Sequence, residues 1–360
     1  MPKLDDYVTL GRSGLRVSPL CLGTMTFGED WAWGSDVETS KRVIDAYLDA
    51  GGNFLDTANI YTNGHSEAII GEHLAGDARK RDRAVIATKF MGNMHRGDPN
   101  GGGAGAKALH NAVEQSLRRL RTDAIDLLWA HFWDRHTPID EMLRSMERLV
   151  QHGKVRHLGL SDHPAWVCAT AQLECRIRGW SPIVGLQIEY SLAERTVEGE
   201  LIPMALEHGM GVTPWSPLKG GHLTGKYTRD KHPDEGRGAA YEHTIPESRW
   251  EIIDELLKVS EEADCTPAEA ALAWVRERPG VSSTIIGART LEQLEKNLRS
   301  LDVELSAEHR SRLDEVSTPS LDFPHDFLER APTAIQNGAS VNGVRSEPWH
   351  MMPDDPKKIW

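Results

Sequence analysis

The sequence predicts a (β/α)8 barrel, in which eight parallel strands alternate with helices, and two observations support this prediction. Short, continuously apolar segments such as AVIAT (84–88) and IDLLWAH (125–131) are typical of parallel strands that are buried on both faces. Segments with a helical pattern follow these strands in turn along the chain, and this alternation is the one expected of an α/β fold.

The predicted elements follow one another along most of the chain. The expected strands lie at 18–23, 53–56, 84–88, 125–131, 155–160, 183–187, 210–214 and 283–286. The expected helices lie at 37–50, 66–76, 106–120, 138–151, 164–177, 198–208, 248–278 and 290–299. Two helix starts are marked by a threonine before a proline, at Thr137–Pro138 and at Thr266–Pro267. These assignments place the barrel within residues 1–316.

Three segments lie outside the alternation. The N-terminal DYVTLGRSGLRVS predicts an added β-hairpin with GRSG as its turn. Residues 217–247 form a long loop after the seventh strand, and loops of this length are usually functional or mobile. Residues 317–360 form a C-terminal extension, and its apolar residues favour docking on the barrel over disorder.

The composition excludes several classes of protein. A formal net charge of −13 argues against a general nucleic-acid binder. No apolar run approaches the length that a transmembrane helix needs, and the first residues lack the apolar core of a signal peptide. None of the four cysteines forms a CxxC pair, so free thiols in a cytoplasmic protein are the expectation. The sequence leaves assembly into a homo-oligomer open.

Three successive strands are predicted to end on polar residues. Asp56 ends the second strand, Lys89 the third and His131 the fourth, while Tyr61 follows in the loop after the second. In (β/α)8 barrels the loops at this end of the strands carry the chemistry, so we expect the four side chains to share one pocket.

These four residue types together suit proton transfer to a carbonyl oxygen. A tyrosine is a poor acid at neutral pH, and a neighbouring ammonium ion lowers its pKa. Asp56 would keep Lys89 charged and in place, and His131 would hydrogen-bond the reacting oxygen. The sequence therefore predicts that Tyr61 is a general acid. Any one of these residues alone would more often be structural or solvated.

Longer matching segments occur in order along the predicted barrel. They are LGTMTFG (22–28), GGNFLDTANIY (51–61), TK (88–89), IDLLWAH (125–131), GKVRHLGLSD (153–162), QIEYSL (187–192), TPWSPLKGGHLTGKY (213–227) and IIGARTLEQLEKNL (285–298). These segments resemble the aldo-keto reductase family. The resemblance implies the barrel fold, a reversible NADPH-dependent reduction of an aldehyde or ketone to an alcohol, and a catalytic tetrad of Asp56, Tyr61, Lys89 and His131.

The resemblance also implies which residues hold the cofactor, NADPH or NADP+, without a Rossmann domain. Ser161, Asp162 and Gln187 would hold the carboxamide, Trp215 would pack on the nicotinamide, and Arg289 would bind the 2′-phosphate at a helix start. Many relatives have Asn in place of Asp162, and an ionised aspartate cannot donate a hydrogen bond to the carboxamide oxygen. The remaining expected contacts are Gly23, Thr24, Met25, Asp56, Ser216, Pro217, Leu218, Gly221, Lys226, Gly287, Gln293 and Asn297.

Trp31, Trp33 and Trp133 follow the first and fourth strands, so we expect an aromatic-walled substrate pocket that also contains Tyr61 and His131. For any single tryptophan, loop packing is an equal alternative. Two other classes of protein remain as alternatives. One is a cofactor-binding regulatory module similar to potassium-channel β subunits, with slow turnover. The other is a metal-dependent barrel hydrolase, which the absence of HxH in the first strand disfavours; no metal is expected.

Overall fold

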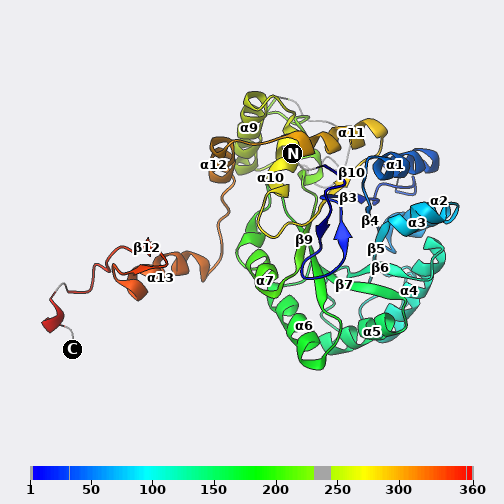
Figure 1. The fold of residues 1–360 in the computed structure, drawn as a ribbon, viewed down its shortest axis with the longest axis horizontal. Helices are drawn as coiled ribbons and strands as arrows, with labels where there is room; N and C mark the ends of the chain where they lie inside the picture. Colours follow the sequence, from blue (N-terminus) through cyan, green and yellow to red (C-terminus); the bar gives the residue numbers. More distant parts are fainter. Residues whose placement is uncertain (1–2, 32, 231–244, 354, 359–360) are drawn as a thin grey trace. The chain divides into compact units, whose positions relative to one another are not determined.

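The structure is a computed structural model that describes residues 3–31, 33–230, 245–353 and 355–358. The chain divides into two compact units, Met1–Thr318 and Pro319–Trp360. The first unit confirms the predicted (β/α)8 barrel (Figure 1). Among the described residues, no helix is both long and apolar enough to span a membrane.

Eight parallel strands form the barrel, in the order β10-β3-β4-β5-β6-β7-β8-β9. They are β3 (Leu20–Gly23), β4 (Phe54–Asp56), β5 (Val85–Phe90), β6 (Ile125–Ala130), β7 (Val155–Ser161), β8 (Ile183–Glu189), β9 (Gly211–Trp215) and β10 (Thr284–Gly287). A parallel bridge between Val212 and Val281 brings β9 next to the start of β10, so the barrel is nearly closed.

Helices surround the strands (Figure 1). They are α1 (Val37–Asp49), α2 (His65–Ala75), α3 (Ala78–Arg83), α4 (Ala106–Leu120), α5 (Ile139–Gln151), α6 (Ala165–Arg178), α7 (Leu201–His208), α9 (Glu247–Glu262), α10 (Pro267–Arg276), α11 (Leu291–Arg299) and α12 (Ala307–Val316). Short 3-10 helices are η1 (Tyr61–Gly64), η2 (Thr196–Glu198), η3 (Lys219–Thr224) and η4 (Ser300–Asp302).

The structure differs from the predicted helices in four places, one of which is α12, a helix that no predicted range covers. The range 248–278 is divided into α9 and α10, because Thr266 and Glu269 form a capping box that starts a new helix at Pro267. The range 198–208 begins with η2, and α7 starts only at Leu201. Helix α3 was not predicted, since its residues ARKRDR lack apolar positions. The predicted loop 217–247 contains η3, and its residues 231–244 lie outside the described part of the chain.

The second unit has its own secondary structure. It contains α13 (His325–Gln336), a hairpin of β11 (Ser340–Val341) and β12 (Val344–Arg345), and η5 (Pro356–Lys358). The predicted docking of residues 317–360 on the barrel remains a prediction.

The predicted N-terminal hairpin closes the end of the barrel opposite the loops that follow the strands. Strands β1 (Val8–Thr9) and β2 (Arg16–Val17) pair antiparallel. Between them, Leu10 is fully buried in the barrel interior, in one cluster with Trp129. The amide of Arg12 donates to the carbonyl of Gly209, just before β9, at 2.8 Å. Any ligand must therefore enter from the other end.

Two glycines make room for the largest side chain in the barrel interior. Trp129 of β6 is fully buried. A Cβ added at Gly159 would lie 2.3 Å from its ring, and one at Gly185 would lie 2.8 Å away. The interior is therefore filled by an indole that spans the space over β7 and β8.

Replacing Gly159 with alanine should destabilise the protein by about 1–3 kcal/mol, the usual cost of overpacking a filled core. Urea unfolding followed by circular dichroism measures this free energy. Gly14→Ala is the matched control, because a Cβ there meets no atom within 4 Å. A Gly159→Ala protein as stable as the control would contradict this description of the core.

Candidate active site

A buried ion pair lies where β4 and β5 end. Nζ of Lys89 donates to Oδ2 of Asp56 at 2.5 Å, and these residues are only 1% and 2% exposed. Burial on its own would lower the pKa of Lys89, but the carboxylate of Asp56 and the phenol oxygen of Tyr61 together outweigh this effect, and the pKa is raised. Lys89 is therefore a cation at neutral pH.

The ion pair has a complete set of hydrogen bonds. Besides Asp56, Nζ of Lys89 donates to the carbonyl of Thr57 and to the hydroxyl of Tyr61, each at 3.0 Å. The second carboxylate oxygen of Asp56 accepts from Nε2 of Gln187 at 3.0 Å. All three ammonium protons and both carboxylate oxygens thus have partners, which offsets the cost of burying two charges.

The backbone that carries Tyr61 has an uncommon conformation. Three successive residues of η1, Thr62, Asn63 and Gly64, have φ values of 44°, 59° and 89°, and the left-handed region is rare for a β-branched residue such as threonine. The buried hydroxyl of Thr62 donates to the carbonyl of Phe27 at 2.7 Å, which holds the turn in place. This turn sets the direction in which Tyr61 leaves the barrel.

A second buried acid ties the tyrosine segment to the lysine strand. Glu67, in the first turn of α2, is fully buried. Its carboxylate accepts from Oγ1 of Thr88 at 2.5 Å and from Nε of Arg119 at 2.7 Å. Because Thr88 directly precedes Lys89, these bonds fix the distance between the lysine and Tyr61.

His131 stands beside Tyr61 as a neutral imidazole. The two rings are 5.9 Å apart between centroids and nearly perpendicular. Burial, together with the charge of Lys89, lowers the pKa of His131 to about 3. Its buried Nδ1 has no hydrogen-bond partner among the residues that the structure describes. The four expected catalytic side chains therefore lie together, with Asp56 and Lys89 beneath the other two.

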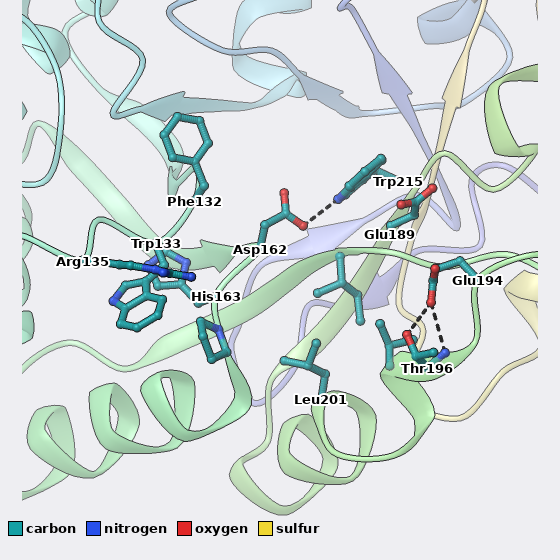
Figure 2. Close-up of a pocket in the computed structure, with 13 residues that line it drawn as sticks. Phe132, Trp133, Arg135, Asp162, His163, Glu189, Glu194, Thr196, Leu201 and Trp215 are labelled. Atoms are coloured by element: carbon teal, nitrogen blue, oxygen red, sulfur yellow. Dashed lines mark hydrogen bonds between the residues drawn. The ribbon is translucent and has the colours of Figure 1, made fainter. Parts of the chain in front are cut away.

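The residues expected near the nicotinamide also meet at strand ends. Asp162 follows β7 in the left-handed region, with φ of 52°. Its carboxylate accepts from Nε1 of Trp215 at 3.0 Å (Figure 2). It also accepts from Oγ of Ser161 at 3.1 Å. One side of the Asp162 side chain faces a cavity, and protein surrounds the rest of it. The loss of hydration raises the pKa of this carboxyl to about 6, although the two hydrogen bonds lower it. Gln187, by contrast, uses its amide nitrogen to hold Asp56.

The remaining predicted cofactor residues lie on segments at the same end of the barrel. Thr24 follows β3, and its amide and hydroxyl both donate to the carbonyl of Asp56, at 2.9 and 3.0 Å. The other members of this set lie beside Thr24, after β9 and around η3: Gly23, Met25, Ser216, Pro217, Leu218 and Gly221. A Cβ at Gly221 would meet no atom within 4 Å, so the backbone there is open to a ligand.

The expected phosphate site lies at the start of α11. Among the described residues, no hydrogen bond or ion pair engages the side chain of Arg289 or of the exposed Lys226. Gln293 accepts from the amide of Arg289 at 2.8 Å, and Asn297 donates to the carbonyl of Gly287 at 3.0 Å. An arginine at the start of a helix, without a side-chain partner among the described residues, fits a phosphorylated cofactor.

The three tryptophans expected at the substrate pocket lie in two separate groups. Trp31 packs against Trp33 at 5.7 Å between centroids and edge-on to Tyr61 at 6.4 Å. Trp133, in contrast, lies with Trp166 at 5.4 Å. The structure therefore brings Trp31 to Tyr61, with Trp33 packed on Trp31, and places Trp133 in a separate aromatic pair.

Two cavities lie beside these tryptophans. One, of about 490 Å³, is shown in Figure 2 and extends from Trp133 to Asp162 and Trp215. The other, of about 660 Å³, borders Trp31. Their lining residues that sequence reasoning missed are Ile60, Asn63, Asn93, Met94, Arg96, Phe132, Arg135, His163, Pro164, Ile188, Glu189, Glu194, Thr196, Val197 and Leu201. Most of them lie on the loops that follow the strands, and this location is the signal that could have identified them.

Comparison with known proteins agrees with this geometry. The sequence model of the Aldo/keto reductase family matches residues 19–318. The chain is 36% identical to a putative aryl-alcohol dehydrogenase of Saccharomyces cerevisiae, covering 90% of this chain and 89% of the yeast protein. It is 35% identical to norsolorinic acid reductase A of Aspergillus parasiticus, covering 89% and 83%.

A third relative is named for its cofactor. The chain is 34% identical to an aryl-alcohol dehydrogenase [NADP(+)] of Phanerodontia chrysosporium, covering 87% of this chain and 86% of that protein. Since the family match spans the whole barrel and includes every strand that contributes to the site, the chain belongs to the aldo/keto reductase family of NAD(P)H-dependent oxidoreductases.

Proposed function

We propose that the protein interconverts aromatic aldehydes or ketones and the corresponding alcohols with NADPH or NADP+, and that Tyr61 is the general acid of reduction. The bond of 3.0 Å from Lys89 to the hydroxyl of Tyr61 is the observation that carries this proposal. Aromatic substrates are supported by the ring of Trp31, which lies edge-on to Tyr61, and by the aryl-alcohol dehydrogenases among the relatives.

The cofactor would supply the hydride, and the residues of this chain would control the proton. Tyr61 gives its proton to the carbonyl oxygen as charge develops there. The ammonium ion of Lys89 stabilises the phenolate that results, and Asp56 keeps that ammonium ion in place. His131, neutral because of its low pKa, donates its single N–H to the same oxygen and orients the carbonyl.

The cofactor would lie across the open end of the barrel. Trp215, Ser161 and Asp162 would hold its nicotinamide, while Arg289 and Lys226 would bind its phosphates. NADPH is preferred over NADH in this proposal because the guanidinium of Arg289 has no protein partner among the described residues and so is free to take a 2′-phosphate.

Tyr61→Phe keeps the ring and removes the proton donor. Its kcat for reducing an aryl aldehyde such as 4-nitrobenzaldehyde should fall by about 10²–10⁴-fold, the usual contribution of general acid catalysis. Its Kd for NADPH should stay within about threefold of the wild-type value, because other loops bind the cofactor. Steady-state absorbance of NADPH and fluorescence titration measure the two quantities.

Tyr7→Phe is the control for this variant, because the Tyr7 hydroxyl donates to the carbonyl of Gly51, away from the site. A Tyr61→Phe enzyme as fast as this control would rule out the mechanism. A wild-type enzyme that binds NADPH tightly but completes no more than a single turnover would instead favour a regulatory role.

Arg289→Ala should weaken NADPH binding by about 1.5–3 kcal/mol, the range for a charged hydrogen bond, with little change for NADH. Arg299→Ala removes a cation from the other end of α11 and should leave both affinities unchanged. Equal losses for NADPH and NADH in Arg289→Ala would contradict the 2′-phosphate assignment. Isothermal titration with each cofactor measures the difference.

The Asp162 carboxyl should make the redox preference of cofactor binding depend on pH. With a pKa of about 6, this carboxyl is neutral at pH 5 and negative above pH 7. The oxidised nicotinamide is positive and the reduced one is neutral, so ionised Asp162 should favour NADP+ by on the order of 1 kcal/mol, or about fivefold. The ratio of the NADPH and NADP+ dissociation constants should therefore rise between pH 5 and 7.

Asp162→Asn should make that ratio independent of pH. Using the ratio removes the titration of the cofactor's own 2′-phosphate, which both redox forms share. The same rise in the Asp162→Asn protein, measured by tryptophan fluorescence quenching, would show that another group is responsible.

A further inference from the structure

The cavity beside Trp31 adjoins the proposed general acid. Its lining residues come from the loop after β3, the tyrosine segment and the loop after β5: Trp31, Ile60, Asn63, Asn93, Met94 and Arg96. Ile60 directly precedes Tyr61 in the chain, and Trp31 lies edge-on to the Tyr61 ring. With a volume of about 660 Å³, this cavity can take the part of a substrate that extends beyond the reacting carbonyl.

Arg96 is the charged residue among those that line this cavity. No hydrogen bond, ion pair or ring contact of its side chain is found within the described ranges. Nearby polar groups have partners of their own. Asn93 donates to the carbonyl of Asp98 and accepts from the amide of His95, each at 2.8 Å. These bonds fold the loop around Arg96 and leave its guanidinium available.

The acids nearest in the sequence to Arg96 and to Trp31 have hydrogen-bond or ion-pair partners of their own. The carboxylate of Asp98 accepts from the amide of Asn100 at 2.8 Å. Asp30, next to Trp31, pairs with Nδ1 of His65 at 2.8 Å. Arg96 therefore brings a positive charge to a cavity whose other lining side chains are apolar or carry neutral amides. In the described structure this charge has no protein counterion.

The other cavity has the opposite electrostatic character. Figure 2 shows Asp162, Glu189 and Glu194 on its lining. Its one arginine, Arg135, lies over the ring of Trp133, with 5.1 Å between the guanidinium carbon and the ring centroid. An anionic group is disfavoured among these carboxylates, so of the two cavities only the one beside Trp31 suits an anion.

We propose that the substrates of this enzyme include aromatic carbonyl compounds that carry a carboxylate, and that Arg96 binds this carboxylate. The inference rests on the proposed function and specifies the class of its substrate. The planar guanidinium matches a carboxylate through two parallel N–H bonds. The ring of the substrate would lie against Trp31 and Met94, with its carbonyl directed at Tyr61. Because this contact is the same before and during reaction, it lowers KM and leaves kcat unchanged.

The test compares 4-carboxybenzaldehyde with its methyl ester, which has the same ring and aldehyde but no charge. The wild-type enzyme should have the lower KM for the acid. Arg96→Gln should raise the KM for the acid about tenfold, the lower end of the range for a charged hydrogen bond because Arg96 is exposed. Its kcat and its KM for the ester should change less than about twofold. Arg96→Lys should retain part of the preference.

Arg135→Gln is the matched control, because it removes an arginine from the other cavity. It should leave the KM for the acid unchanged. Equal losses for acid and ester in Arg96→Gln would overturn the proposal, and so would a loss for the acid that follows Arg135 instead of Arg96.

An equilibrium measurement separates this inference from the proposed function. Binding of 4-(hydroxymethyl)benzoate, followed by quenching of tryptophan fluorescence, needs no turnover. About tenfold weaker binding in Arg96→Gln supports carboxylate recognition even if the aldehydes are not reduced, in which case the proposed function fails by itself. Unchanged binding overturns the inference whatever the turnover.

Discussion

The buried ion pair of Asp56 and Lys89 is the interaction on which the rest of the site depends. Two charges that are almost completely removed from water are costly, and they persist only where hydrogen bonds satisfy every proton and lone pair. In this protein the partners come from β8 through Gln187 and from the tyrosine segment through Thr57 and Tyr61. The barrel therefore has to close correctly before the pair is stable, and the fold and the chemistry are specified together.

The same pair explains the neighbouring features. The positive charge that Lys89 retains helps keep His131 neutral, and it lies against the Tyr61 hydroxyl. The uncommon backbone conformation at Thr62 is tolerated because surrounding contacts, such as the bond from its hydroxyl to the carbonyl of Phe27, hold the turn in place. Strained backbone at functional sites usually persists for this reason. The site is thus held by a connected set of buried polar contacts and not by one side chain.

Much of the fold, and the meeting of the four expected side chains at one end of the barrel, could be predicted from the sequence because the signals were local. Continuous apolar runs revealed the strands, and Asp56, Lys89 and His131 stood where those runs ended. Contacts between distant segments could not be predicted in this way. Gln187 reaches Asp56 across the barrel, and nothing near Gln187 in the sequence indicates that partner.

Other features were missed because their signals were weak or ambiguous. Arg96 lies in a polar loop where a charge is ordinarily solvated. Only the adjoining cavity, which the sequence does not reveal, indicates a role in binding. The division of α9 from α10 was visible in Thr266 and Pro267, but the surrounding helical pattern concealed it. The unusual backbone of Thr62 cannot be read from residue type, since a threonine rarely adopts it.

The N-terminal hairpin has an evolutionary consequence. Because Leu10 and its neighbours fill one end of the barrel, buried apolar side chains separate the polar residues around Lys89 from the solvent at that end. The loops at the open end can then accumulate insertions and exchanges without altering how Lys89 and Tyr61 are held. Such separation makes new specificities accessible by small changes, and relatives with different named substrates, such as the aryl-alcohol dehydrogenases and the norsolorinic acid reductases, are the outcome that it favours.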